Sequence, residues 1–203
     1  MLKIYGTAMS RASRALWAAE ELGLKYEHVP VGFADGGTRK PEYLKVNPNG
    51  HVPALEDGAV TLCESMAINL YLAEKHGKAP LWPSTVEDHG RAYQWSFWGM
   101  MECEGHLLTA FLNRMMLPPE QRNEKAVKDA LEALAKPLKV LDDHLKGREY
   151  LLGKDFTVAD LNVAGVLILL PMLQIDMAST PNAKAWLDKC LARPALERAR
   201  AKG

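Results

Sequence analysis

The segment over residues 47–65 constrains the fold of this chain more than any other stretch. Prolines, glycines and asparagines crowd together in it, and such a density breaks helix and strand and fixes defined turns. Val52 precedes Pro53, so Val52 must be extended, and Pro53 has no N–H to donate. The backbone groups of Val52 could therefore pair with an extended peptide, as an added strand would.

The second half of this segment predicts a β-hairpin followed by a helix. Residues 54–56 and 60–63 read as short strands, and Asp57-Gly58 between them is a hairpin signal. Glu64 and Ser65 then open a helix, whose first N–H groups and partial positive charge favour a bound carboxylate. An ordinary tight turn before a capped helix explains the same pattern.

The spacing N-P-x-G-x-V-P-A-L-x-D-G, followed by x-L-x-E-S-x-A-I-x-x-Y-L, resembles the glutathione-binding half of cytosolic glutathione transferases. The resemblance implies that glutathione is a co-substrate and that the backbone of Val52 pairs with its cysteinyl part. It implies a cis bond at Pro53, and it assigns the γ-glutamyl end of glutathione to Glu64 and Ser65.

The order of elements predicts an α/β domain followed by an all-helical one. Strand, helix and strand patterns precede the hairpin and its helix, which matches a thioredoxin-like, glutathione-binding domain over residues 1–78. Residues 79–86 contain two prolines and read as a linker. Residues 87–203 carry only helical patterns, over 87–116, 120–146, 157–173 and 183–193. The same family has this two-domain plan, in which the helical domain forms the second-substrate site.

One short motif in the helical part is a folding signal. Thr157-Val158-Ala159-Asp160 stands as a capping-box variant before an apolar run. It resembles the N-capping motif in the helical domain of these transferases, so we assign Thr157 and Asp160 a structural role.

A thiol-activating hydroxyl is expected where the first helix begins. The thiol of glutathione resembles that of free cysteine, whose pKa is about 8.5, and the thiolate is the nucleophile. A hydroxyl donor at a helix N-terminus can lower that pKa. Ser10 and Ser13 both lie at such a place, and Tyr5 and Thr7 fit less well.

The run Ser10-Arg11-Ala12-Ser13-Arg14-Ala15-Leu16 resembles the serine-type transferases of the theta, phi and bacterial nu kinds. In them the serine comes four residues before an Arg-Ala or Arg-Arg pair, a register that assigns the catalytic role to Ser10. Ser13 would then face inward or cap the helix. This turn has no Cys-x-x-Cys, so dithiol exchange is excluded here.

Two further groups of residues complete the expected site. His51 could reach the glycine-end carboxylate of glutathione, or be a solvated loop histidine, and Arg39 competes with Lys40 for the same carboxylate. Trp98, Met101 and Glu102 are candidates for a second-substrate pocket between the domains, although their spacing also fits a core stripe.

Composition excludes several classes of partner. The chain has 25 basic and 25 acidic side chains, which gives no electrostatic case for nucleic acid or an anionic membrane. No apolar run is long enough to span a bilayer. Its 6 histidines have no metal-ligand spacing, so no metal is expected. An odd set of 3 separated cysteines favours a reducing compartment, hence the cytoplasm.

The sequence therefore indicates a cytoplasmic glutathione transferase, and the family resemblance implies a homodimer. Its thiolate would attack a small apolar electrophile, and peroxide reduction or dehalogenation would use the same sulfur. The alternative is a non-enzymatic binding module of the same fold, in a translation or stress complex. Such modules often lose the activating hydroxyl, whereas Ser10 is present.

Overall fold

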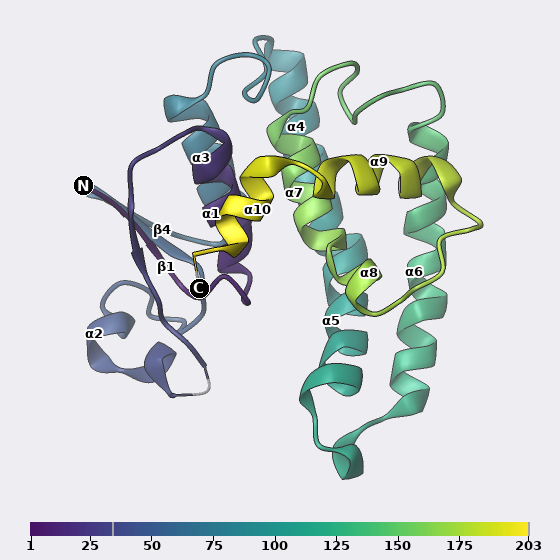
Figure 1. The fold of residues 1–203 in the computed structure, drawn as a ribbon, viewed down its shortest axis with the longest axis horizontal. Coiled ribbons are helices and arrows are strands. Elements are labelled where there is room, and N and C mark those ends of the chain that lie inside the picture. The colour runs from purple at the N-terminus through teal and green to yellow at the C-terminus, as the bar shows by residue number, and fades with distance from the viewer. Residues whose placement is uncertain (34, 203) are drawn as a thin grey trace. The chain divides into compact units, whose positions relative to one another are not determined.

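The computed structural model describes residues 1–33 and 35–202. It divides into two compact units, one formed by Met1–Pro83 with Ala192–Gly203 and the other by Ser84–Leu191. Figure 1 shows the strands and the helices of each unit along the chain. We describe each unit by itself.

The first unit is built on a mixed sheet. Within the described residues its strand order is β2-β1-β3-β4, with β1 parallel to β2 and antiparallel to β3. The α1 crossover joins β1 to β2, and the β3–β4 hairpin leads into α3. This arrangement confirms the thioredoxin-like prediction. The bounds are β1 (Leu2–Tyr5), α1 (Ala12–Glu21), β2 (Glu27–Val29), α2 (Pro41–Leu44), β3 (Ala54–Asp57), β4 (Val60–Cys63) and α3 (Ser65–His76).

Local details differ from the sequence reading in two places. The second strand, β2, has only 3 residues, and the segment after it holds a 3-10 turn, η1 (Gly37–Arg39), before α2. The hairpin loop is Gly58-Ala59, because Asp57 still pairs with Val60. Gly58 has φ +64°, which glycine adopts without strain.

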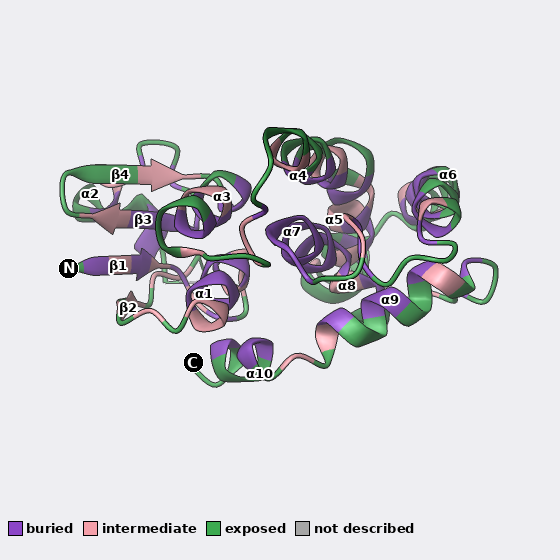
Figure 2. Ribbon diagram, turned by 90° about the horizontal axis from the view of Figure 1, so that it is seen from above, coloured by how far each residue is buried: buried purple, intermediate pink, exposed green. Residues whose placement is uncertain are grey.

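Apolar side chains from the sheet and from two helices form the core of this unit. Ile4 and Leu55 point inward from paired strands, and Leu16, Ile68 and Leu72 come from α1 and α3; all five are fully buried. Figure 2 shows the buried faces of these elements in purple. The core thus fixes the position of α1 and α3, whose N-terminal ends carry the predicted site.

The second unit is all-helical, as predicted. One continuous helical stretch runs through α4 (Val86–Trp98), η2 (Gly99–Glu104), α5 (Gly105–Phe111) and η3 (Leu112–Met116), where η2 and η3 are π-helical. It is followed by η4 (Pro119–Gln121), α6 (Glu124–His144), α7 (Val158–Leu167), α8 (Leu169–Met172) and α9 (Pro181–Leu191). The predicted capping box opens α7, where Asp160 accepts from the N–H of Thr157 at 2.9 Å.

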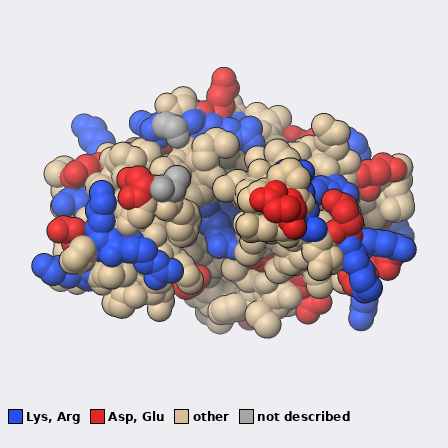
Figure 3. Space-filling view, turned by 90° about the horizontal axis from the view of Figure 1, so that it is seen from below, with Lys and Arg blue, Asp and Glu red and all other residues tan. Residues whose placement is uncertain are grey.

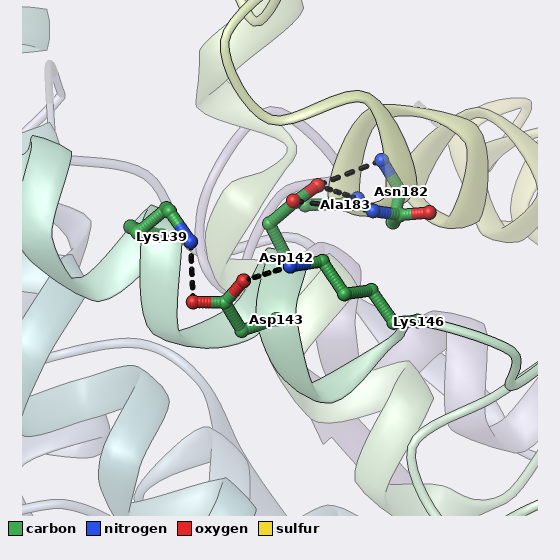
Figure 4. Close-up of polar contacts among 6 residues, drawn as sticks. All are labelled: Lys139, Asp142, Asp143, Lys146, Asn182 and Ala183. Atoms are coloured by element: carbon green, nitrogen blue, oxygen red, sulfur yellow. Dashed lines mark hydrogen bonds and ion pairs between the residues drawn. The ribbon is translucent and has the colours of Figure 1, made fainter.

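Asp142 near the end of α6 holds the first turn of α9. Its carboxylate accepts from the backbone N–H of Asn182 at 2.7 Å and of Ala183 at 3.0 Å (Figure 4). The side-chain amide of Asn182 adds a third bond at 3.2 Å. A buried carboxylate from another helix therefore satisfies orphan N–H groups at the start of α9.

The last helix, α10 (Pro194–Arg200), was not predicted from sequence. Pro194 ends α9, as expected, but it also stands at the first turn of α10, where its missing N–H costs nothing. The guanidinium of Arg193 donates twice to Glu21 of α1, at 2.6 and 2.8 Å. Residues 192–203 therefore join the first unit, whereas the sequence-based boundary placed them in the helical domain.

The surface charges and the hydropathy of the helices agree with the composition of the sequence. Lys and Arg are interspersed with Asp and Glu on the face drawn in Figure 3, as expected from equal numbers of the two. In the described part of the chain, no helix combines the length and the apolar character that crossing a membrane requires.

Candidate functional site

Val52 offers backbone hydrogen-bonding groups just before the inner strand β3. Its side chain is buried, the Val52–Pro53 peptide is cis as predicted, and β3 begins only at Ala54. Within residues 1–33 and 35–202, neither the N–H nor the C=O of Val52 has a hydrogen-bond partner. Backbone groups of buried residues are nearly always paired, so this segment is suited to an extended ligand.

The peptide that carries the N–H of Val52 is held firmly on its other side. Its carbonyl, that of His51, accepts from the hydroxyl of Tyr43 at 2.5 Å and from the side-chain amide of Asn47 at 2.6 Å. Burial raises the pKa of Tyr43 to about 12, so its hydroxyl stays protonated and donates at neutral pH. Two donors on one carbonyl orient the peptide and polarise its N–H toward an acceptor.

Gly6 brings Val52 against the start of α1. Its φ is +122°, and a Cβ atom there would lie 2.6 Å from the Cβ of Ala12 and 2.9 Å from the Cβ of Val52. Only glycine permits this approach. The turn that carries Ser10 and the exposed peptide of Val52 are therefore neighbours in the same unit.

Ser10 lies half-buried just before α1. Its hydroxyl donates to the carbonyl of Thr7 at 2.8 Å and accepts from the N–H of Ala12 at 3.1 Å. Ser10 thus satisfies an N–H at the start of α1. Ser13 lies one turn further on, inside α1. The phenol of Tyr5 donates to Glu56, so its proton is engaged elsewhere.

The start of α3 combines a carboxylate, a hydroxyl and a buried cation. Glu64 is exposed and has φ +71°, an unusual conformation for a residue with a side chain. Ser65, the first residue of α3, is buried and accepts from the guanidinium of Arg14 at 3.4 Å. In the sequence motif, Arg14 served only to identify Ser10 as the serine four residues before it. Its position among the apolar residues of α1 was the signal that it faces inward.

Arg39 and Lys40, the two candidates for binding the glycine-end carboxylate of glutathione, lie before Val52 in the same unit. Arg39 and Lys40 are both exposed. A Cβ atom at Gly50 would lie 2.8 Å from a guanidinium nitrogen of Arg39, so this guanidinium covers Gly50, next to His51. The side chain of His51 is exposed. This contact favours Arg39 over Lys40 as the cation beside the loop.

The candidate second-substrate residues lie in the other unit, around the π-helical segment η2. Trp98 is half-buried and packs edge-on against Trp95, with ring centroids 5.0 Å apart. Met101 and Glu102 are exposed, and 79% of Met101 is accessible. Trp95 itself is buried in the core of this unit. A groove of about 470 Å³ on α6 includes none of these residues; Arg114, Glu124, Val127, Lys128, Leu131, Glu132 and Ala135 line it.

Metal ligands are not grouped in the part of the chain that the structure describes. Among the described residues, no three His, Cys, Asp or Glu side chains lie close enough together to hold a metal ion. The arrangement around Val52 instead offers an available backbone N–H and C=O at Val52. It also offers the hydroxyl of Ser10 at the start of α1, and the start of α3 with the charged Glu64 and Arg14 beside it.

Comparison with known proteins identifies close similarities along the whole chain. Residues 1–74 match the family model of the glutathione S-transferase N-terminal domain, and residues 104–194 match that of the C-terminal domain. The chain is 35% identical over 204 residues to glutathione S-transferase 4 of Zea mays, covering 96% of this chain and 89% of that protein. It is 33% identical to glutathione S-transferase F13 of Arabidopsis thaliana, covering 96% and 92%.

Solved structures give the same result. The theta class glutathione S-transferase of Xanthomonas axonopodis pv. citri, with glutathione bound, is similar with a TM-score of 0.91 and 31% identity, covering 100% of this chain and 98% of that one. The structure of glutathione S-transferase-I bound with lactoylglutathione is similar with a TM-score of 0.88 and 32% identity, covering 98% of both chains.

Proposed function

This chain belongs to the glutathione S-transferase family, and we propose that it transfers glutathione to small apolar electrophiles through a thiolate stabilised by Ser10. One observation carries the proposal. The N–H and C=O of Val52 are available to an extended peptide in the same unit as the Ser10 turn, with Gly6 in contact range of both segments. Glutathione is such a peptide, and its thiol belongs to the residue that would pair with Val52.

The ends of glutathione suit the charges around this peptide. We assign the α-ammonium group of the γ-glutamyl end to the carboxylate of Glu64. The α-carboxylate of the same γ-glutamyl end would bind the hydroxyl of Ser65 and the N-terminus of α3, where Arg14 adds a buried positive charge. The glycine carboxylate would face Arg39 and His51. Charge-assisted bonds at both ends would fix the sulfur between them.

The chemistry follows from the hydroxyl of Ser10. That O–H now donates to the carbonyl of Thr7, and rotation about the Cβ–Oγ bond can redirect it to an anionic sulfur. The thiol proton leaves to solvent, the sulfur attacks an electrophilic carbon, and the leaving group departs with its electron pair. The same thiolate would reduce a peroxide. We assign the electrophile to Trp98, Met101 and Glu102 of the helical unit.

The test replaces each serine in turn. Ser10→Ala should leave glutathione binding largely intact and raise the pKa of the bound thiol toward about 8.5. Turnover of a model aryl halide at neutral pH should then fall by roughly 10–100-fold and recover in part at alkaline pH. Ser13→Ala should lower only the stability, by about 1 kcal/mol. If Ser13→Ala raises the thiol pKa and Ser10→Ala does not, the assignment is wrong.

We also propose that the protein is a cytoplasmic homodimer. The exposed apolar side chains of Tyr93 and Phe97 lie four residues apart on α4, which gives them one common face. Its three cysteines are free, which suits a reducing compartment. A second copy of the chain is the partner that the family resemblance implies.

A further inference from the structure

His28 lies on the edge strand β2 and makes a bond that the proposed mechanism has not used. Its Nε2 atom is 2.6 Å from the carbonyl oxygen of Gly6. A carbonyl can only accept, so Nε2 carries the proton and donates it. The side chain is half-buried, and β2 is a strand of only 3 residues at the edge of the sheet.

This bond holds the Gly6–Thr7 peptide, which lies between the end of β1 and the turn that carries Ser10. The N–H of Gly6 donates to Val29 at 3.0 Å, so both polar groups of Gly6 are tied to β2. The next residue, Thr7, accepts from the backbone N–H of Ser10 at 3.0 Å and from its hydroxyl at 2.8 Å. Two sets of hydrogen bonds, one at the carbonyl of Gly6 and one at the carbonyl of Thr7, are joined by the covalent backbone of Thr7 and therefore link the imidazole of His28 to the hydroxyl of Ser10.

The space around Gly6 is also tight. Its φ is +122°, and a Cβ atom there would lie 2.6 Å from the Cβ of Ala12 and 2.9 Å from the Cβ of Val52, so three segments meet closely at this residue. The carbonyl of Thr7 belongs to the next peptide and is attached through the Thr7 Cα atom, so a rotation of the Gly6–Thr7 peptide would displace it and the hydroxyl of Ser10 that is bonded to it. A displacement of about 1 Å in such a group is enough to reduce catalysis strongly.

We propose that His28 is a positioning residue for thiol activation. Its imidazole N–H fixes the Gly6–Thr7 peptide and thereby places the hydroxyl of Ser10 for the sulfur of glutathione. The inference rests on the proposed function of Ser10. It predicts a larger effect on the ionisation of bound glutathione than on glutathione affinity, because the His51–Val52 peptide keeps its own donors from Tyr43 and Asn47.

The test uses two amides that differ by one methylene. The amide nitrogen of His28→Gln can take the place of Nε2 and reach the carbonyl of Gly6, whereas that of His28→Asn is too short. Neither amide titrates, so any change in the pH profile belongs to the thiol. Glu27→Gln, on an exposed side chain of the same strand, is the matched control. Urea unfolding confirms that each variant is folded.

The pH profile of kcat/KM and the titration of bound thiolate absorbance are measured for all variants and for Ser10→Ala. His28→Asn should lower kcat/KM below the thiol pKa by about 3–10-fold, raise that pKa, and leave the glutathione Kd within about twofold. His28→Gln and Glu27→Gln should behave as the wild type.

Three results overturn the inference, and they can be told apart. If Ser10→Ala raises the thiol pKa and His28→Asn does not, His28 has no positioning role and the proposed function stands. If Ser10→Ala itself leaves the pKa unchanged, the proposed activation fails, and the role of His28 fails with it. Equal losses in His28→Gln and His28→Asn would likewise exclude a role for the donor at Nε2.

Discussion

Removal of the Tyr43 hydroxyl tests whether the donors on the His51 carbonyl prepare the Val52 peptide for its ligand. Tyr43→Phe keeps the ring, which lies 6.0 Å from that of Tyr5, and deletes only the O–H that donates to His51 at 2.5 Å. A neutral hydrogen bond contributes about 0.5–1.5 kcal/mol. Because the amide of Asn47 still binds the same carbonyl, we expect the lower half of that range.

The loss should appear in glutathione binding as well as in stability. About 0.5–1 kcal/mol corresponds to a roughly 2–5-fold increase in the Kd of glutathione, measured by calorimetry. The pKa of Tyr43 is raised to about 12 by burial, so its phenol is protonated throughout the usual assay range. The increase in Kd should therefore be the same at about pH 6 and at about pH 9.

A double-variant cycle with Asn47→Ala sharpens the test. Each single variant leaves one donor on the His51 carbonyl, and the double variant removes both. The combined loss should exceed the sum of the single losses by about 0.5 kcal/mol or more. Tyr71→Phe, which deletes a hydroxyl bonded to Asp57 at 3.0 Å, is the control. If Tyr43→Phe and Asn47→Ala lower stability but bind glutathione as the wild type does, the reasoning is refuted.

Three further predictions follow from other parts of the molecule. Glu64→Ala and Glu64→Gly should weaken glutathione binding equally, by about 1.5–3 kcal/mol, but the glycine variant should unfold at higher urea because φ is +71° there; equal stability would exclude backbone strain. Although burial opposes it, the bonds from Ala183 and Asn182 hold the pKa of Asp142 below its usual value. Its contribution is therefore complete above the unfolded pKa of about 3.9 and is lost as pH falls through the folded pKa. Asp142→Asn should cost about 0.5–2 kcal/mol in urea unfolding at pH 7, and clearly less near pH 3; a constant difference would contradict the charged cap. Phe97→Asp should shift the protein from dimer to monomer in light scattering, whereas Lys128→Asp on α6 should not; an unchanged dimer would exclude this face.

The sequence by itself determined the elements whose signals are local. The strand, helix and strand that precede the hairpin, the hairpin at Gly58 and the capping box at Thr157 all depend on neighbouring residues, and the structure has each of them. Turn chemistry and helix caps act within a few residues, so they can be read without knowing the fold. The motif around Val52 and Pro53 could be recognised for the same reason, because its spacing is continuous.

Only the tertiary structure decided which side chains from distant segments share one place. Arg14 and Ser65 are 51 residues apart in the chain, and the core places the guanidinium of one on the hydroxyl of the other. Nothing in the sequence pattern around His28 indicates that it binds Gly6, because parallel pairing of β1 with β2 creates that contact. The helix at residues 194–200 was missed because Pro194 is both a stop and a start signal, and packing against α1 selects the second. Burial and pairing over long separations depend on the whole fold, so these features could not be read from local spacing.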